Sequence, residues 1–237
     1  MSERVLVIGG TRGTGRLISA LLHRRGYLVR VLARNPGRAS ARLDPGVEVV
    51  GGDITKPNTL PGAVSGADHI IFTAGVRSGR FARESLVKAT DYQGALNALT
   101  AAKNAGLGGR FMYMNSIGIH TPSWAAAVLN FVKGNTLEWR WRVEDAIRDS
   151  GLDYTIIRAG FLLNAAGGRH AISVSQGALP LLPRYRIARA DVAEAFVEAL
   201  RHPRASRATF ELAWGKGTRR EEWSTLYDRL ERDFDEA

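Results

Sequence analysis

Three spaced glycines follow a short apolar run near the N-terminus, and their spacing suits the binding of an anion. The segment Val5–Leu17 reads VLVIGGTRGTGRL, with Gly9, Gly13 and Gly15 in the pattern G-x-x-x-G-x-G. Gly9 permits a tight turn, Gly13 lets the backbone approach a phosphate, and Gly15 lets a helix pack closely on a strand. Amides at the helix start then face the anion. A plain strand–helix turn is the alternative. The other loop residues expected at this phosphate site are Thr11, Arg12 and Thr14.

An arginine follows the second predicted strand, where dinucleotide sites that prefer NAD carry an acid. Residues Val31–Asn35 read VLARN. A guanidinium offers a planar fork of donors and a permanent charge, which suits the 2′-phosphate of NADP(H). One hydrogen bond to a charged group contributes about 1.5–3 kcal/mol, so one such arginine favours NADP over NAD by about ten- to a hundredfold. Arg34 and Arg12 are therefore the candidate ligands of this phosphate, unless both only face water.

Small and acidic residues follow the next two predicted strands. Asp53 and Ile54 come after the third strand, where the carboxylate can accept from an adenine amino group and the isoleucine can pack on the ring. After the fourth strand, Thr73, Ala74 and Gly75 leave room for the adenosine ribose. Each group alone is also compatible with ordinary turn chemistry. Together they fall where a bound dinucleotide would lie.

The elements that position these residues alternate between apolar runs and helical patterns. Such alternation predicts parallel strands joined by right-handed crossovers, that is, an α/β doubly wound sheet with strand order 3-2-1-4-5-6. We expect one Rossmann-type domain over 1–237, with a small C-terminal substrate lobe whose lid segments are 161–190 and 211–237. The expected strands are 4–8, 27–33, 47–50, 69–73, 110–115 and 154–158. The expected helices are 16–25, 59–64, 92–106, 124–148 with a break near Gly134, 191–200 capped by Asp191, and 223–230.

Composition limits the class of protein. The 237 residues include no cysteine, which excludes disulfides and thiolate metal sites, and no metal site is predicted. The net charge is +10, but the arginines are scattered and carry no nucleic-acid-binding motif. No signal peptide or membrane-spanning run is predicted. We therefore expect a cytoplasmic monomer or homodimer that binds a small-molecule substrate, without nucleic acid or membrane partners. The charge either solvates the surface or attracts a polyanionic cofactor.

Several motifs together resemble the short-chain dehydrogenase/reductase superfamily, specifically its atypical NAD(P)H-binding group (NmrA-like and flavin-reductase-like members). The resemblance covers nearly the whole chain and implies a Rossmann-fold NADP(H) binder. The motifs that carry it are GGTRGTGRL (9–17), VLAR (31–34), GD (52–53), TAG (73–75), DYQGALNALTAAKNAG (91–106), NSIG (115–118), SGLDYTIIRAG (150–160) and IARADVAEAFVEAL (187–200).

The same resemblance suggests the catalytic residues. It places Ser116 beside the nicotinamide, Arg140 at the position of the lysine in Tyr-x-x-x-Lys, and backbone groups near Ala159 at the carboxamide. Thr136 then stands where the tyrosine would. A threonine hydroxyl is a poor general acid near neutral pH. Arg140 remains suited to hold ribose hydroxyls or a developing oxyanion. The missing tyrosine leaves water, Ser116 or His120 as proton sources.

Three functions follow from these residues. The first is an NADP(H)-dependent oxidoreductase acting on a small organic molecule. The second is a non-catalytic NADP(H)-binding sensor or regulator, which the missing tyrosine favours. The third is a non-redox isomerase or lyase on the same scaffold. His120, Lys133 and Trp124 are further candidates near the site, although each suits a structural or solvated role.

Overall fold

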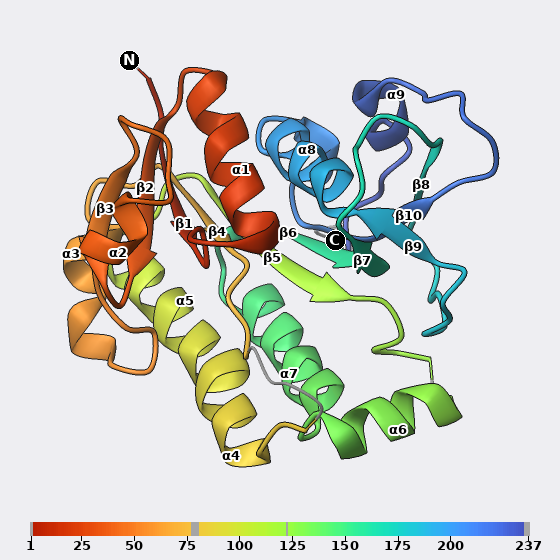
Figure 1. Cartoon of the computed structure of the whole chain (residues 1–237), viewed down its shortest axis with the longest axis horizontal. Coiled ribbons are helices and arrows are strands. Elements are labelled where there is room, and N and C mark those ends of the chain that lie inside the picture. The colour runs from red at the N-terminus through yellow and green to blue at the C-terminus, as the bar shows by residue number, and fades with distance from the viewer. Residues whose placement is uncertain (1, 77–80, 122, 235–237) are drawn as a thin grey trace.

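The computed structural model of the chain describes residues 2–76, 81–121 and 123–234. Within them, an eight-stranded sheet has the order β3-β2-β1-β4-β5-β6-β10-β8 (Figure 1). Its first six positions confirm the predicted order 3-2-1-4-5-6. The strands are β1 (Arg4–Ile8), β2 (Leu28–Ala33), β3 (Glu48–Gly51), β4 (His69–Phe72), β5 (Arg110–Ser116), β6 (Asp153–Ala159), β8 (Ile172–Ser175) and β10 (Ala208–Trp214).

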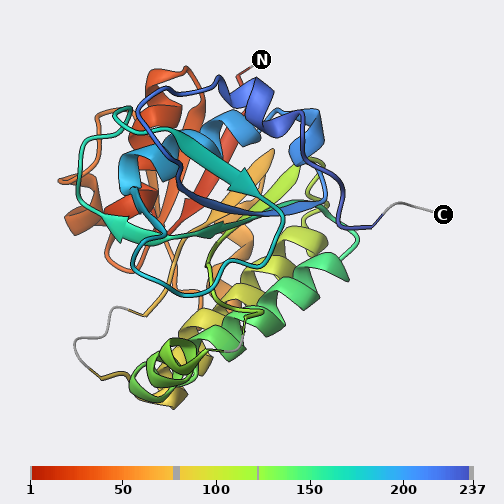
Figure 2. The ribbon, with the colours of Figure 1, turned by 90° about the vertical axis from the view of Figure 1, so that its right-hand side faces the viewer.

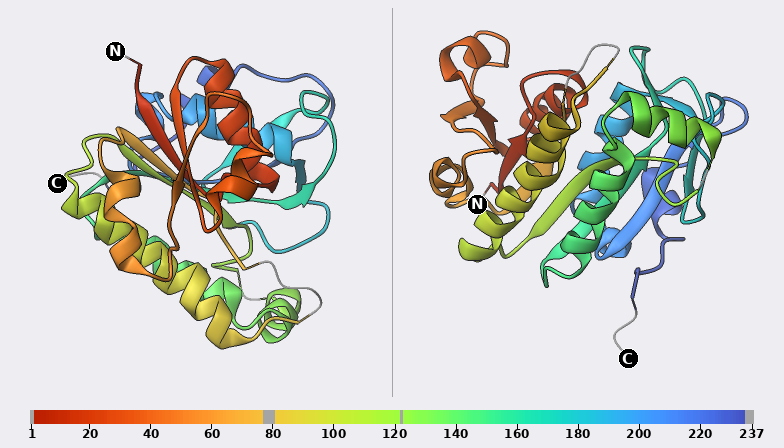
Figure 3. Two further views of the ribbon diagram at one scale, coloured as in Figure 1. Left: turned by 60° about the vertical axis from the view of Figure 1, so that its left-hand side comes forward. Right: turned by 90° about the horizontal axis from the view of Figure 1, so that it is seen from below.

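Helices cover both faces of this sheet, which explains why strands such as RVLVI in β1 are apolar on both sides. On one face, α1 (Gly13–Arg24) lies beside α8 (Arg189–Ala199). On the other, α5 (Gly94–Asn104) lies beside α7 (Thr136–Arg148), as Figure 3 shows from below. Each layer has its own apolar core. The shorter helices are α2 (Pro36–Ser40), α3 (Pro61–Val64), α4 (Glu84–Val87), α6 (Trp124–Val132) and α9 (Trp223–Tyr227), with 3-10 turns η1 (Pro57–Thr59) and η3 (Pro203–Ala205).

One predicted helix is longer and more irregular than expected, and another is interrupted where the sequence predicts. The helix expected over 92–106 begins at α4 and continues into α5 through a π-helical segment, η2 (Lys88–Gln93). The helix expected over 124–148 breaks at Gly134 and Asn135, whose φ angles are +61° and +57°. This break confirms the predicted interruption and separates α6 from α7.

The C-terminal third contains strands that the sequence analysis did not predict. β8 lies inside the expected loop and pairs antiparallel with β10, while β10 pairs parallel with β6. Residues 211–214 are therefore part of the main sheet. A separate pair, β7 (Phe161–Leu163) and β9 (Arg186–Ala188), also lies in this region, which faces the viewer in Figure 2. These short strands are defined by tertiary pairing, so they leave little periodicity in the sequence.

Asp191 does not cap α8 as predicted. The helix begins two residues earlier, with Ala188 at the N-cap. The Asp191 carboxylate instead accepts hydrogen bonds from Gly168 N (2.8 Å), Trp214 Nε1 (2.8 Å) and Arg220 Nη1 (3.1 Å). It thus fastens α8 to the C-terminal segments. Among the described residues, no helix combines the length and apolarity needed to cross a membrane.

The turn from β1 into α1 is packed too closely for any side chain at Gly15. A Cβ there would overlap the carbonyl oxygen of Gly9 and lie 2.5 Å from Thr73 Oγ1. Gly9 itself has φ +92°, a conformation that side chains rarely adopt. The helix can therefore approach β1 and β4 only because glycine occupies position 15.

We expect Gly15→Ala to lower the free energy of unfolding by about 1–3 kcal/mol, because backbone must move to admit the methyl group. Gly37→Ala in α2 is the matched control, since a Cβ at Gly37 meets nothing within 4 Å. Urea unfolding followed by circular dichroism measures both. Equal stability of the two variants would contradict the close packing of α1.

Candidate functional site

The loops predicted to bind a cofactor meet at the carboxyl edge of the sheet. β1 lies between β2 and β4 in parallel register, so the residues that follow these strands are neighbours. Backbone hydrogen bonds continue the register past the strand ends, from Thr73 N to Ile8 O (2.8 Å) and from Gly52 N to Ala33 O (3.1 Å). The structure thereby brings together the glycine loop, Arg34, Asp53 and the Thr73–Gly75 segment.

The glycine loop has the character of an anion site. Helix α1 starts at Gly13, whose φ is +53°, and no side chain caps its first turn. The Thr14 hydroxyl is buried there without a hydrogen-bond partner among the described residues. Arg12 and Arg16 are exposed on either side, and Thr11 is half-buried. A helix start without a side-chain cap, an unpartnered hydroxyl and flanking cations fit the pyrophosphate of a dinucleotide.

Arg34 and Asp53 form the far end of the same edge. Arg34 is exposed after β2, and Asp53 follows β3. Burial opposes ionisation of Asp53, but hydrogen bonds from Thr55 and the nearby charge of Arg34 outweigh it and lower its pKa. Ile54 is only 9% exposed and packs against Gly94 of α5. The end of the edge thus presents a guanidinium beside a carboxylate, over an apolar floor.

Arg140 reaches this edge from helix α7 and is held by a buried aspartate. Its Nε lies 3.2 Å from Asp91 Oδ2, which also accepts from the Thr136 hydroxyl at 3.4 Å. The other carboxylate oxygen accepts from Val76 N at 2.6 Å. A Cβ on Gly75 would lie 2.6 Å from Arg140 Nη2. The guanidinium therefore lies against the loop predicted to hold a ribose.

Asp91 is a site residue that the sequence analysis did not single out, although it is the first residue of the DYQG motif. It lies in η2, and π-helical segments occur frequently at functional sites. Burial lowers the pKa of Arg140, but the adjacent Asp91 carboxylate outweighs this and raises it. The cation is thus permanently charged. Because the Thr136 hydroxyl points to Asp91, its proton is directed to that carboxylate.

Ser116 ends β5 and is linked to Arg140 through Asn115. Its amide donates to Asn115 Oδ1 (2.9 Å), and its hydroxyl donates to Ile117 O (3.2 Å). The Asn115 amide donates to Arg140 O (3.4 Å) and to Glu144 Oε1 (2.7 Å). One asparagine therefore sets the position of Ser116 relative to α7.

Glu144 is the completely buried centre of a charged cluster beneath the site. Its side chain is 0% exposed and faces Asn115 together with three basic residues. Arg158 donates through Nε (2.9 Å) and Nη2 (2.6 Å), and Arg148 donates through Nη2 (3.0 Å). His120 Nε2 lies 3.5 Å away. Burial opposes ionisation, but the hydrogen bonds from Arg158 and His120 and the nearby arginine charges lower the Glu144 pKa to about 2.

A second buried acid, Glu211, extends the cluster onto β10. Asn115, Arg158 and Glu211 are direct neighbours on β5, β6 and β10, so they form one row across the sheet. Glu211 Oε2 accepts from Leu179 N at 2.5 Å, and Leu179 O accepts from Gly118 N at 3.0 Å. Burial raises the Glu211 pKa to about 7. The carboxyl group thus attaches the segment around Leu179 to the end of β5.

The backbone groups expected at a carboxamide are used within the protein. Ala159 O accepts from Ile117 N at 3.1 Å, and Gly160 N donates to Leu212 O at 2.9 Å. Phe161 N donates to Tyr185 O at 2.8 Å. The chain past β6 stays in the sheet and then joins the β7–β9 pair. These backbone groups therefore already form hydrogen bonds within the protein, which the sequence motif alone did not indicate.

The remaining aromatic and histidine candidates lie at the margin of the site. His120 packs edge-on against Trp141 at 5.3 Å between ring centroids, with its imidazole next to Glu144. Trp124 is 80% exposed on α6, which projects from the body of the protein (Figure 2).

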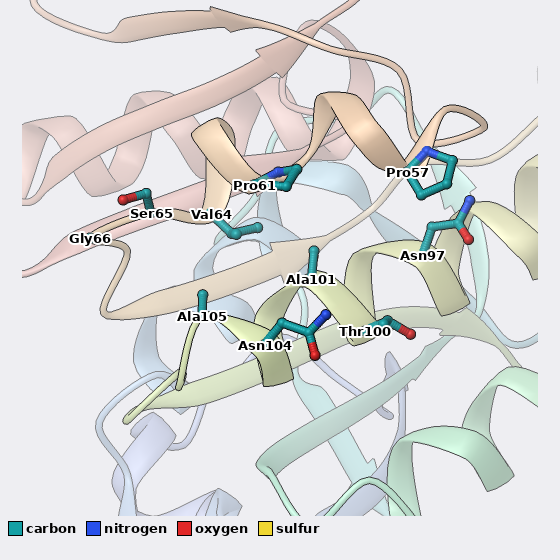
Figure 4. Close-up of a pocket in the computed structure, with 10 residues that line it drawn as sticks. All are labelled: Pro57, Pro61, Val64, Ser65, Gly66, Asn97, Thr100, Ala101, Asn104 and Ala105. Carbon is teal, nitrogen blue, oxygen red and sulfur yellow. The ribbon is translucent and has the colours of Figure 1, made fainter.

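A groove of about 420 Å³ lies between η1–α3 and α5 (Figure 4). Prolines Pro57 and Pro61 form one wall, while Asn97 and Asn104 belong to the helix opposite. None of the groups described above lines it. The candidate site is instead the open carboxyl edge.

We expect Glu144→Gln to lower the free energy of unfolding by about 3–5 kcal/mol at pH 7, because buried Arg158 and half-buried Arg148 both lose the carboxylate that they share. Glu138→Gln is the matched control on the same helix, where an exposed pair with Arg142 contributes about 0.5 kcal/mol or less. Urea denaturation measures both variants. A cost below about 1 kcal/mol for Glu144→Gln would contradict its central role.

Comparing the wild type with Glu144→Gln over a range of pH tests the pKa of Glu144. Its folded pKa of about 2 lies below the ordinary value of 4.5, so ionisation stabilises the fold above pH 4.5. This stabilisation is lost as pH falls towards 2. The difference between the wild type and Glu144→Gln should therefore narrow at pH 3, and a constant difference would contradict the assignment.

The comparisons with known proteins agree with this geometry. The profile of an NAD(P)H-binding family matches residues 9–203. Sanguinarine reductase of Eschscholzia californica is 31% identical, over 97% of this chain and 97% of that protein. The photosystem II assembly factor Ycf39 of Trieres chinensis is 25% identical, over 95% of this chain and 68% of that protein. The oxidoreductase ylbE of Lactococcus lactis has the same fold, with a TM-score of 0.77, 19% identity and 96% coverage of both chains.

Proposed function

Since the chain belongs to this NAD(P)H-binding family of Rossmann-type short-chain dehydrogenase/reductase relatives, we propose that it is an NADP(H)-dependent oxidoreductase acting on a small organic molecule. One observation carries the choice of cofactor. Arg34 is exposed beside Asp53 at the edge that also holds the unpartnered Thr14 hydroxyl. An arginine after β2 suits a 2′-phosphate, whereas NAD sites place an acid there.

Successive groups of residues along the carboxyl edge of the sheet bind successive parts of the dinucleotide. The glycine loop from Gly9 to Thr14 receives the pyrophosphate through amides and the Thr14 hydroxyl. Arg34 and Arg12 bind the 2′-phosphate, and Asp53 accepts from the adenine amino group. The Thr73–Gly75 segment and Arg140 hold the two riboses. When bound, NADPH supplies a hydride to the substrate.

The protein contributes charge and orientation near Ser116 and Arg140. Arg140 stays charged beside Asp91 and is suited to stabilise an oxyanion that develops on the substrate. The Ser116 hydroxyl can donate to the same oxygen. His120 is the candidate proton source, because its Nε2 lies 3.5 Å from Glu144 Oε2 at the margin of the site. Thr136, whose hydroxyl is bonded to Asp91, serves to position that carboxylate.

A second candidate is a binding protein that holds NADP(H) without turnover and acts on a protein partner. The specific observation in its favour is Thr136 at the tyrosine position, with its hydroxyl directed to Asp91. The relative named as an assembly factor is consistent with a role of this kind. Isomerisation or elimination on the same scaffold would likewise retain the cofactor without net oxidation.

We expect Arg34→Glu to weaken NADPH binding by about ten- to a hundredfold while leaving NADH affinity within about twofold. Nicotinamide fluorescence during titration gives both constants. Arg204→Glu has the same change of charge at an exposed position in η3, and it controls for the protein's overall field. Equal losses for NADPH and NADH, or equal effects of the two substitutions, would contradict a 2′-phosphate site at Arg34.

A test for NADPH turnover distinguishes the oxidoreductase function from the non-catalytic binding function. The purified chain is mixed with NADPH and a panel of quinones, flavins and aromatic carbonyls, and the absorbance of NADPH is followed. We expect consumption with at least one acceptor, which Arg140→Gln reduces by about a hundredfold. Tight NADPH binding without consumption by any acceptor class would favour the binding protein.

A further inference from the structure

Arg189 approaches the glycine loop from the C-terminal part of the chain. It is the first residue of α8, which packs beside α1. Arg189 Nε would lie 4.0 Å from a Cβ built on Gly13, and beyond the loop and helix that hold Gly13 no other described residue comes within 4 Å of that position. The guanidinium therefore faces the open side of Gly13, where the first turn of α1 begins.

The charge of Arg189 is held in place by neutral groups. Its Nη1 donates to Leu162 O at 3.1 Å and to Asn164 Oδ1 at 2.8 Å. Within the described ranges, no carboxylate comes within ion-pair distance of this guanidinium. Among the described residues, a fixed cation without a counter-charge thus lies beside a helix start that no side chain caps and a Thr14 hydroxyl without a hydrogen-bond partner. Such an arrangement attracts an anion.

We infer that Arg189 is a pyrophosphate ligand, which closes the phosphate site from the C-terminal side and couples cofactor binding to the segment 161–168. The inference rests on the proposed dinucleotide function. It adds a ligand that comes from outside the β1–α1 loop. Arg189 is hydrogen-bonded to Leu162 and Asn164, so an anion that binds the guanidinium at Gly13 also stabilises the positions of these two residues. The pyrophosphate would then connect the β1–α1 loop to the segment 161–168.

The pyrophosphate and the 2′-phosphate can be separated by choice of probe. NADPH carries both groups, ADP-ribose carries only the pyrophosphate, and 2′-AMP carries only the 2′-phosphate. We expect Arg189→Gln to weaken NADPH and ADP-ribose by a similar factor of about ten to a hundred, and to leave 2′-AMP within twofold. Arg186→Gln, an exposed arginine on β9, is the matched control and should change none of the three affinities.

Calorimetric titration of the folded variants gives these constants. Unchanged ADP-ribose affinity in Arg189→Gln, or an equal loss for 2′-AMP, would overturn the inference while leaving the proposed function standing. A wild-type chain that binds neither NADPH nor ADP-ribose would overturn both. Arg189→Lys keeps the charge and should retain more ADP-ribose affinity than Arg189→Gln. Equal affinity losses in the two variants would instead indicate that any replacement of Arg189 disturbs the packing.

Hydrogen exchange tests the coupling. On addition of ADP-ribose, we expect slower amide exchange in residues 161–168 of the wild type, because the bound Arg189 holds Leu162 and Asn164. Arg189→Gln measured at saturating ADP-ribose should lose this protection. Equal protection in the two proteins would overturn the coupling.

Discussion

The arrangement of the site depends on the hydrogen bonds and ion pairs of the buried Glu144 carboxylate. A buried carboxylate is costly unless charge and hydrogen bonds compensate it. Here Asn115 on β5 and Arg158 on β6 both donate to a side chain of α7. The helix is thereby fixed against two central strands. Arg140 lies one turn earlier on the same helix, so the position of the guanidinium at the cofactor edge follows from the ion pair beneath it.

Because buried charges require partners, the acidic and basic groups of the site differ in where they lie. Acids that the site uses, Asp91 and Glu144, are buried and paired with arginines. The cations at the carboxyl edge, Arg12 in the glycine loop and Arg34 after β2, are exposed. A polyanionic cofactor thus meets positive charge from solvent, while the buried acids keep the inner cations oriented. The net charge of +10 left open either a solvated surface or attraction of a polyanionic cofactor, and the exposed arginines at this edge favour the second.

Local motifs predicted the fold correctly, because glycine spacing and apolar runs reflect contacts close in sequence. Ser116, Thr136 and Arg140 were identified by resemblance, and their partners were not. Asp91 is 49 residues from Arg140, and Glu211 is 32 residues from Leu179, so neither pair leaves a local pattern. Strand β8 was missed for the same reason. Asp191 was misassigned because a short acid near a helix start resembles a cap until its partners on other segments are known.

The central claim is that the 2′-phosphate of NADP(H) binds between guanidinium groups at the end of β2. Phosphorus NMR of bound NADP⁺ tests it directly, because the resonance of this phosphate reports its own titration. Arginine contacts favour the dianion, so its pKa, about 6 for a phosphate monoester, should fall on binding. A 2′-phosphate resonance that titrates in the complex as it does in free NADP⁺ would contradict the account.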